Sequence, residues 1–151
     1  MQVARFVFLT MLPSTGTQGD PPGGVVWMLV SPNNRTLGRG LSLHRSYADC
    51  RDAVLRLREG GPRCRPVLSN VEATGQWTWR VELDGRQVAM ASRSYLRMRE
   101  CSYNLERFLA VLPAAEVVPG TRAVRRGRWH GDPGAGEGET RPGASLRQVA
   151  R

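Results

Sequence analysis

Apolar and polar side chains alternate along residues 77–83, which is the pattern of a β-strand with one buried face. The apolar positions are Trp77, Trp79, Val81 and Leu83. Asp84 and Gly85 follow directly, and both residue types tolerate the positive φ that a tight hairpin turn requires. The pattern therefore predicts a β-hairpin with residues 87–92 as its return strand.

From residue 46 onward, apolar residues recur at steps of three and four, which indicates an amphipathic helix. This stripe consists of Tyr47, Cys50, Val54 and Leu57. Ser46 and Asp49 have nearly the spacing of a capping box, so the helix is predicted to begin there. Gly60, Gly61 and Pro62 end the helix, because Gly permits the left-handed cap and Pro cannot continue the hydrogen-bond ladder.

A second stripe of the same spacing predicts a helix that ends before Pro113. Its members are Met98, Cys101, Leu105, Phe108 and Leu112. Arg97 stands where the first helix has Ser46, so this helix lacks an evident side-chain cap, at a cost of about 1 kcal/mol.

Residues 27–57 and 79–108 align at an offset of 51 or 52 positions, and apolar residues match apolar residues throughout. The aligned pairs include Trp27 with Trp79, Cys50 with Cys101, and Leu57 with Phe108. In the first copy, residues 25–31 and 36–43 form the hairpin around a turn at residues 32–34. Residues 3–11 and 66–72 are candidate leading strands.

The predicted fold class is α+β, with two tandem ββ(β)α repeats in which each antiparallel sheet is covered by one helix. A unit of about fifty residues buries only about 60% of its unfolded surface, so two fused units gain stability by sharing one core and covering each other's open sheet edges. The expected repeats are residues 1–61 and 62–115, with a flexible insertion at 13–24 in the first. Residues 116–151 are rich in Arg, Gly and Pro and predict a disordered tail.

One motif in the second copy resembles a known family. It runs through residues 75–81 (Gly-Gln-Trp-Thr-Trp-Arg-Val) and 84–89 (Asp-Gly-Arg-Gln-Val-Ala) to Ser92, Tyr95 and Cys101. This order is similar to that of the YegP-like family, which consists of small, uncharacterised bacterial and archaeal tandem-repeat proteins. The resemblance implies units of three antiparallel strands with one helix across a face, and two such units that pack about a pseudo-two-fold axis. It carries no agreed activity.

Basic residues outnumber acidic ones by 22 to 13, and all of the basic residues are Arg. A basic balance attracts polyanions, because each arginine placed at a phosphate releases counterions. The candidate nucleic-acid contacts in the tail are Arg122, Arg125, Arg126, Arg128 and Trp129. An aromatic residue beside arginines can stack on a base, although a solvated tail explains the same residues more simply.

A second group of arginines is expected near the start of the second helix. Its members are Arg93, Arg97, Arg99 and Arg107. The alternative interpretation of this group is an ordinary solvated surface.

The cysteines and histidines do not form a recognisable reactive set. Cys50 and Cys101 lie on apolar helix stripes and are predicted to be buried small hydrophobes. Cys64 lies between two arginines, which favours a lowered pKa and a more reactive thiol, unless it is an incidental loop cysteine. With His44 and His130 the only histidines, neither a zinc set nor a Cys–His pair is expected.

No catalytic constellation or cofactor motif is recognisable in the sequence, and neither a secretory signal nor a membrane span is expected. The leading hypothesis is a cytoplasmic, monomeric, non-enzymatic binding or scaffold protein with an unknown protein partner. The alternative is a nucleic-acid-binding protein that uses its Arg-rich surface and basic tail.

Overall fold

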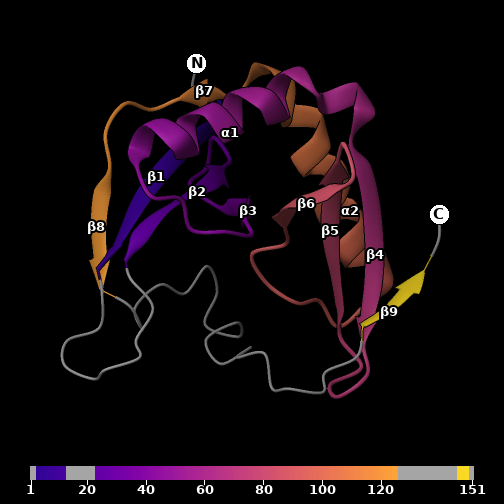
Figure 1. The fold of residues 1–151 in the computed structure, drawn as a ribbon. Helices are drawn as coiled ribbons and strands as arrows, with labels where there is room; N and C mark the ends of the chain where they lie inside the picture. Colours follow the sequence, from indigo (N-terminus) through magenta and orange to yellow (C-terminus); the bar gives the residue numbers. More distant parts are fainter. Residues whose placement is uncertain (1–2, 13–22, 126–145, 150–151) are drawn as a thin grey trace.

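The computed structural model describes residues 3–12, 23–125 and 146–149 (Figure 1). Three strands and a helix come first, and their bounds are β1 Arg5–Leu12, β2 Gly24–Val30, β3 Thr36–Gly40 and α1 Tyr47–Glu59. The same order follows in β4 Arg65–Val71, β5 Trp77–Leu83, β6 Arg86–Met90 and α2 Met98–Val111. Each helix continues into a short 3₁₀ turn, at Gly61–Arg63 and Leu112–Ala114. The remaining strands are β7 Glu116–Val117, β8 Arg122–Arg125 and β9 Leu146–Val149.

The nine strands of the described residues belong to one mixed sheet, so the protein is α+β. The order across the sheet is β7-β1-β2-β3-β6-β5-β4-β9, and β8 also pairs with β1. The expectation of separate antiparallel sheets is therefore wrong. The two hairpins join edge to edge where β3 pairs antiparallel with β6, which leaves neither edge open to solvent.

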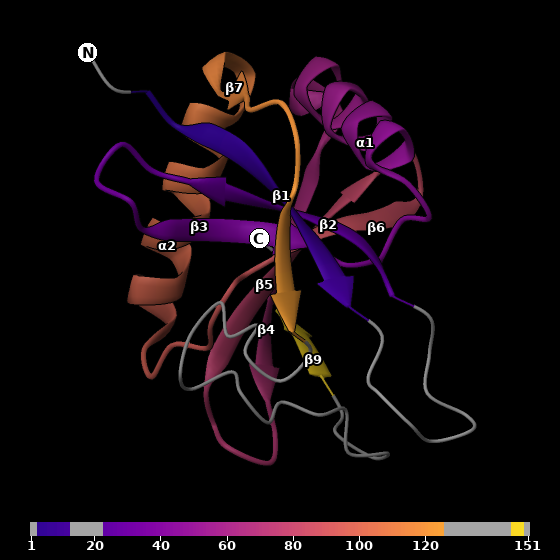
Figure 2. The same cartoon turned by 90° about the vertical axis from the view of Figure 1, so that its left-hand side faces the viewer.

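The two helices pack against different strands. Helix α1 contacts β1 and β2, whereas α2 contacts β5, β4 and also β3 from the preceding hairpin. Figure 2 shows the helices well separated, with β1 between them in that view. Because α2 reaches across to β3, the first and second parts of the chain share packing surface.

The centre of the core is aromatic. The Phe108 ring lies 4.8 Å from the Trp79 ring and 6.4 Å from the Trp27 ring, measured between centroids. All three side chains are almost completely buried. At Gly38, a Cβ atom would lie 2.7 Å from Trp79 Cη2 and 2.8 Å from Phe108 Cδ2. This glycine therefore lets β3 lie directly against the aromatic rings, since any side chain there would displace them.

The local signals in the sequence correctly predicted both helices. At the start of α1 the backbone N–H of Asp49 donates to Ser46 Oγ at 3.1 Å, which confirms the cap. Helix α2 begins after Arg97 with no side-chain cap, as expected. Asp84 and Gly85 have φ values of 51° and 81°, the left-handed conformation that the hairpin turn between β5 and β6 requires.

In the described residues beyond 115, three short strands stand where a disordered tail was expected. Strands β7 and β8 pair parallel with β1, and the backbone N–H of Glu116 donates to the Ala4 carbonyl at 3.0 Å. Val117 and Val124 pack on apolar side chains of the sheet. The polar composition of this segment wrongly indicated disorder, because a few apolar residues are enough to hold a strand at an open sheet edge. Strand β9 pairs with β4, while residues 126–145 and most of the predicted insertion lie outside the described residues.

No helix in the described part of the chain is both long and apolar enough to cross a membrane.

Candidate functional site

Two cavities lie at the junctions between the early and late parts of the chain. One, of about 890 Å³, lies between α2, the loop that leads into α2 and the β2–β3 turn. We call it the α2 cavity. The other, of about 410 Å³, lies between α1, the loop that leads into α1 and the β5–β6 turn. We call it the α1 cavity.

The α2 cavity is strongly basic. Its arginines are Arg35 from the β2–β3 turn, Arg93 from the β6–α2 loop, and Arg99 and Arg107 from α2. Glu100 is the one carboxylate among its lining residues, so their formal charge is +3. The structure thus brings together three arginines of the group expected near the second helix. It adds Arg35, which lies far away in the sequence, whereas Arg97 is the N-cap and is not among the lining residues.

Backbone and side-chain hydrogen bonds hold Arg35 at the mouth of the α2 cavity. Its carbonyl accepts from the Ser31 N–H at 2.8 Å, and its own N–H donates to Ser31 Oγ at 3.1 Å. Ser92 Oγ donates to the Thr36 carbonyl at 3.3 Å and ties the turn to the β6–α2 loop. The two segments that carry Arg35 and Arg93 are therefore fixed to one another.

Aromatic side chains are interleaved with these arginines. The guanidinium carbon of Arg93 lies 4.7 Å from the centre of the Tyr95 ring, the geometry of a cation–π contact. Tyr95 is fixed in turn by two backbone hydrogen bonds with Trp77, at 2.6 and 2.7 Å. Tyr103 also lines the cavity and is 63% exposed, so its ring is accessible for stacking.

The α2 cavity touches the core at Asn104. The Asn104 Oδ1 atom accepts a buried hydrogen bond from the Trp79 indole N–H at 2.6 Å. This bond satisfies the indole donor and fixes the face of α2 that carries Arg107, one turn further along. The position of the arginine thus depends on core packing.

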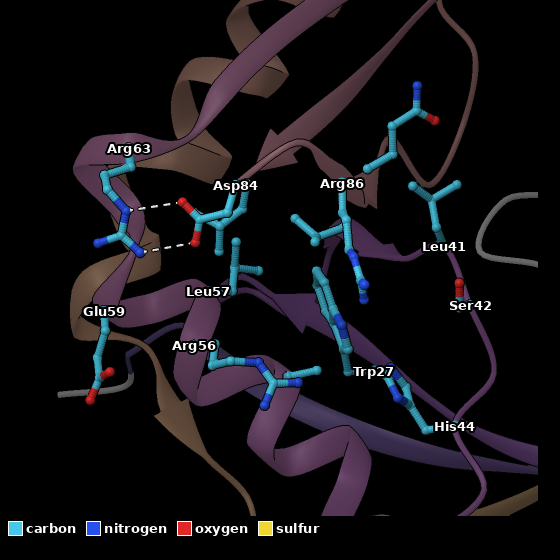
Figure 3. Close-up of a pocket in the computed structure, with 14 residues that line it drawn as sticks. Trp27, Leu41, Ser42, His44, Arg56, Leu57, Glu59, Arg63, Asp84 and Arg86 are labelled. Carbon is cyan, nitrogen blue, oxygen red and sulfur yellow. Dashed lines mark hydrogen bonds and ion pairs between the residues drawn. The ribbon is translucent and has the colours of Figure 1, made fainter.

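The α1 cavity contains a smaller set of charged groups (Figure 3). Arg56 extends from α1 and Arg86 from the start of β6, and both point toward the buried Trp27 indole. Burial lowers the pKa of His44 at the same cavity, and the nearby positive charge of Arg56 acts in the same direction, whereas Asp49 opposes it. At the rim, Arg63 donates two hydrogen bonds to the Asp84 carboxylate, at 3.3 and 3.2 Å.

Arg122 is the one residue of the tail site whose side chain the structure describes, and it lines neither cavity. Arg122 is exposed on β8, and Arg125 is the last residue of that strand. Arg126, Arg128 and Trp129 lie outside the described residues. The tail site stays a prediction.

The three cysteines are free thiols. Cys50 and Cys101 are fully buried, as expected, and burial raises the pKa of Cys50 to about 12. The expected lowering of the Cys64 pKa is wrong. Burial raises this pKa, and the positive charge of Arg63 lowers it by less. Partial desolvation destabilises the thiolate more than the exposed guanidinium group of Arg63 stabilises it.

These environments predict the order in which the thiols react. In the folded protein at neutral pH, a disulfide reagent should modify Cys64 alone, more slowly than an unfolded peptide thiol, because the raised pKa leaves less thiolate. Cys50 and Cys101 should react only after denaturant is added. Absorbance at the reagent's product band counts the thiols, and modification of Cys64 faster than a peptide control would contradict the prediction.

Among residues 3–12, 23–125 and 146–149 there is no group of three or more His, Cys, Asp or Glu side chains arranged to hold a metal ion.

These features define a small α+β protein whose described residues form a mixed nine-stranded sheet with arginines lining the α1 and α2 cavities. Its fold is similar to that of the protein of unknown function YegP from E. coli, with a TM-score of 0.52 and 10% identity, over 80% of this chain and 94% of that one. A UPF0339 protein from Shewanella oneidensis also has a TM-score of 0.52, with 8% identity over 83% of this chain and 96% of that one. The resemblance to YegP-like proteins is therefore confirmed at the level of the fold. No protein-family model and no curated protein sequence matches the chain.

Proposed function

We propose that this chain is a non-enzymatic binding protein and that the α2 cavity binds single-stranded nucleic acid. The observation that carries the proposal is the set of four arginines at one cavity with one opposing carboxylate. Among the described residues, Arg35, Arg99 and Arg107 make no side-chain hydrogen bond or ion pair, so their guanidinium groups are available to phosphates. The α2 cavity also lacks the paired acid and base that proton-transfer catalysis requires.

The tyrosines support a single strand as the ligand. Proteins that bind single strands combine a basic groove along the backbone with aromatic rings on which bases stack. The exposed ring of Tyr103 supplies such a surface between Arg99 and Arg107 on the same helix. The cavity volume of about 890 Å³ is large enough for a nucleotide, because it lies in the range of small-molecule binding sites.

A protein partner is the second candidate, and exposed apolar residues at the start of α2 favour it. Leu96 is 76% exposed and Met98 is 45% exposed, directly before the basic residues of the helix. Exposed apolar residues beside a charged rim are common at protein interfaces. In this case the surface serves as a scaffold contact rather than a nucleic-acid groove.

Salt titration of oligonucleotide binding tests the proposal. If the four arginines contact phosphates, log K should fall against log salt with a slope of about −2.8, or about 50-fold between roughly 50 and 200 mM salt. Fluorescence anisotropy of a labelled mixed-sequence single strand measures the slope. Absence of salt-sensitive binding at low ionic strength would overturn the nucleic-acid assignment and favour the protein partner.

We further propose that the chain is a tandem pair of ββ(β)α repeats related by a pseudo-two-fold axis near the β3–β6 junction. The central strand order β1-β2-β3-β6-β5-β4 supports this, because it visits equivalent strands from either end. Irregular features also recur at the sequence offset. The isolated bridges Val25↔His44 and Trp77↔Tyr95 correspond, as do the register shifts after Leu29 and after Val81.

A further inference from the structure

We infer that the α1 cavity is a separate site for a small organic oxyanion, a molecule with an apolar body and one phosphate or carboxylate group. This inference does not depend on nucleic-acid binding at the α2 cavity, because the two cavities share no lining residue.

The first support is an uncompensated pair of guanidinium groups. Arg56 and Arg86 come from different elements and line the same cavity. Within the described part of the chain neither makes a side-chain hydrogen bond or ion pair. Two arginines that converge on one space repel each other, and an oxyanion between them would remove this repulsion with charge-assisted hydrogen bonds.

The second support is the arrangement of the nearby carboxylates. Asp84 lines the cavity, but its two oxygens already accept hydrogen bonds from Arg63 at 3.3 and 3.2 Å. Glu59 lies on the Arg63 side of the cavity in Figure 3, away from Arg86, and its charge acts on Arg63. The acidic residues therefore leave the space around Arg56 and Arg86 positively charged.

The third support is the apolar floor. Trp27 is 2% exposed, and its ring is held between Phe6, in edge contact at 5.4 Å, and Phe108, stacked at 6.4 Å. Leu41 and Val88 complete the apolar lining near the arginines. A rigid apolar wall beside two cations fits a ligand with an aromatic or aliphatic body better than it fits a bare inorganic ion.

The α1 cavity is smaller than the α2 cavity, so a smaller ligand is expected in it. At about 410 Å³ it has under half the volume of the α2 cavity, and it is bounded by a helix, a loop and a hairpin turn. It therefore suits a small molecule. Since α1 and the β5–β6 hairpin lie in different halves of the sequence, a bound ligand would join them.

Calorimetric titration of the full chain with four probes tests the inference. The probes are phenyl phosphate, benzoate, inorganic phosphate and the neutral benzyl alcohol. One of the two aromatic anions should bind saturably, and at least about tenfold more tightly than inorganic phosphate and benzyl alcohol. The preferred anion decides between phosphate and carboxylate as the natural group. Absence of saturable binding by both aromatic anions would overturn the inference.

Variants locate the site. Arg56→Gln and Arg86→Gln should each weaken binding of the preferred anion at least about tenfold. Arg51→Gln removes the same charge from the exposed surface of α1 outside the cavity and should leave the affinity within about twofold. Arg99→Gln in the α2 cavity should also have no effect, which keeps this test independent of the proposed function. Equal weakening by all four substitutions, or by none, would contradict a site between Arg56 and Arg86.

Discussion

Replacement of Trp79 by Ala is expected to lower the free energy of unfolding by about 3 to 5 kcal/mol, a large fraction of the stability of a domain this size. The Trp79 side chain is fully buried and packs on Phe108, with 4.8 Å between ring centroids. Its removal leaves a large cavity at the point where β3, β5 and α2 meet, and the buried Oδ1 atom of Asn104 loses its hydrogen-bond donor. Urea denaturation followed by far-UV circular dichroism measures the loss.

The neighbouring substitution Asn104→Ala provides a graded comparison. It leaves the Trp79 ring in place but removes the acceptor of its buried N–H, so the expected loss is about 1 to 3 kcal/mol. Both variants should unfold in one transition, since a single core contains Trp27, Trp79 and Phe108. A loss below about 1 kcal/mol for Trp79→Ala, or two separate transitions in the wild type, would show that the halves do not share this core.

The second large effect concerns binding. The double substitution Arg99→Glu with Arg107→Glu is expected to weaken single-stranded oligonucleotide binding about 100-fold near 0.1 M salt, since it removes two phosphate contacts and adds two repulsive charges. Arg99 is exposed and Arg107 half-buried, so the fold should survive, and circular dichroism checks this. Fluorescence anisotropy measures the affinity.

A matched control separates the cavity from net charge. Arg45→Glu with Arg51→Glu makes the same change in total charge at two exposed positions that line neither the α1 nor the α2 cavity. Because screened charges at a distance contribute little, its affinity should fall only a few-fold. If the control pair weakens binding as much as Arg99→Glu with Arg107→Glu, then the interaction is a general effect of charge and the α2 cavity is not the site.

The sequence was sufficient for features that depend on neighbouring residues. The alternation around Trp79, the turn at Asp84 and Gly85, and the cap at Ser46 are local signals, and each matches the structure. The buried state of Cys50 and Cys101 followed from their helix positions for the same reason. Local spacing determines such features because adjacent residues share one strand face, helix face or turn.

Features that depend on distant contacts could not be predicted. Pairing of β3 with β6 merges two expected sheets into one, and it rests on two short segments that carry no distinctive pattern. The pairing of β8 with β1 was not predicted, because the composition of that segment is typical of disordered chains. The sign of the Cys64 pKa shift was also missed, because burial is a property of the folded state that flanking arginines do not reveal.

The candidate site shows the same division. The sequence placed Arg93, Arg99 and Arg107 near the start of the second helix, and all three line the α2 cavity. Arg35 was missed, because only the fold brings the β2–β3 turn to this helix. The offset of 51 residues between Arg35 and Arg86, and between Arg56 and Arg107, was visible in the sequence. This offset could have indicated that each cavity receives one arginine from a hairpin and one from a helix, Arg35 with Arg107 and Arg86 with Arg56.

Chemical-shift mapping by NMR tests the central claim, that the α2 cavity is the nucleic-acid site, most directly. On titration of the ¹⁵N-labelled full chain with a short single strand, the largest amide shifts should cluster on α2, at Arg35 in the β2–β3 turn and at Arg93 in the β6–α2 loop. Resonances of the α1 cavity, such as that of Arg86, should change little. Shifts confined to the α1 cavity or to β8, or no shifts at low salt, would contradict the claim.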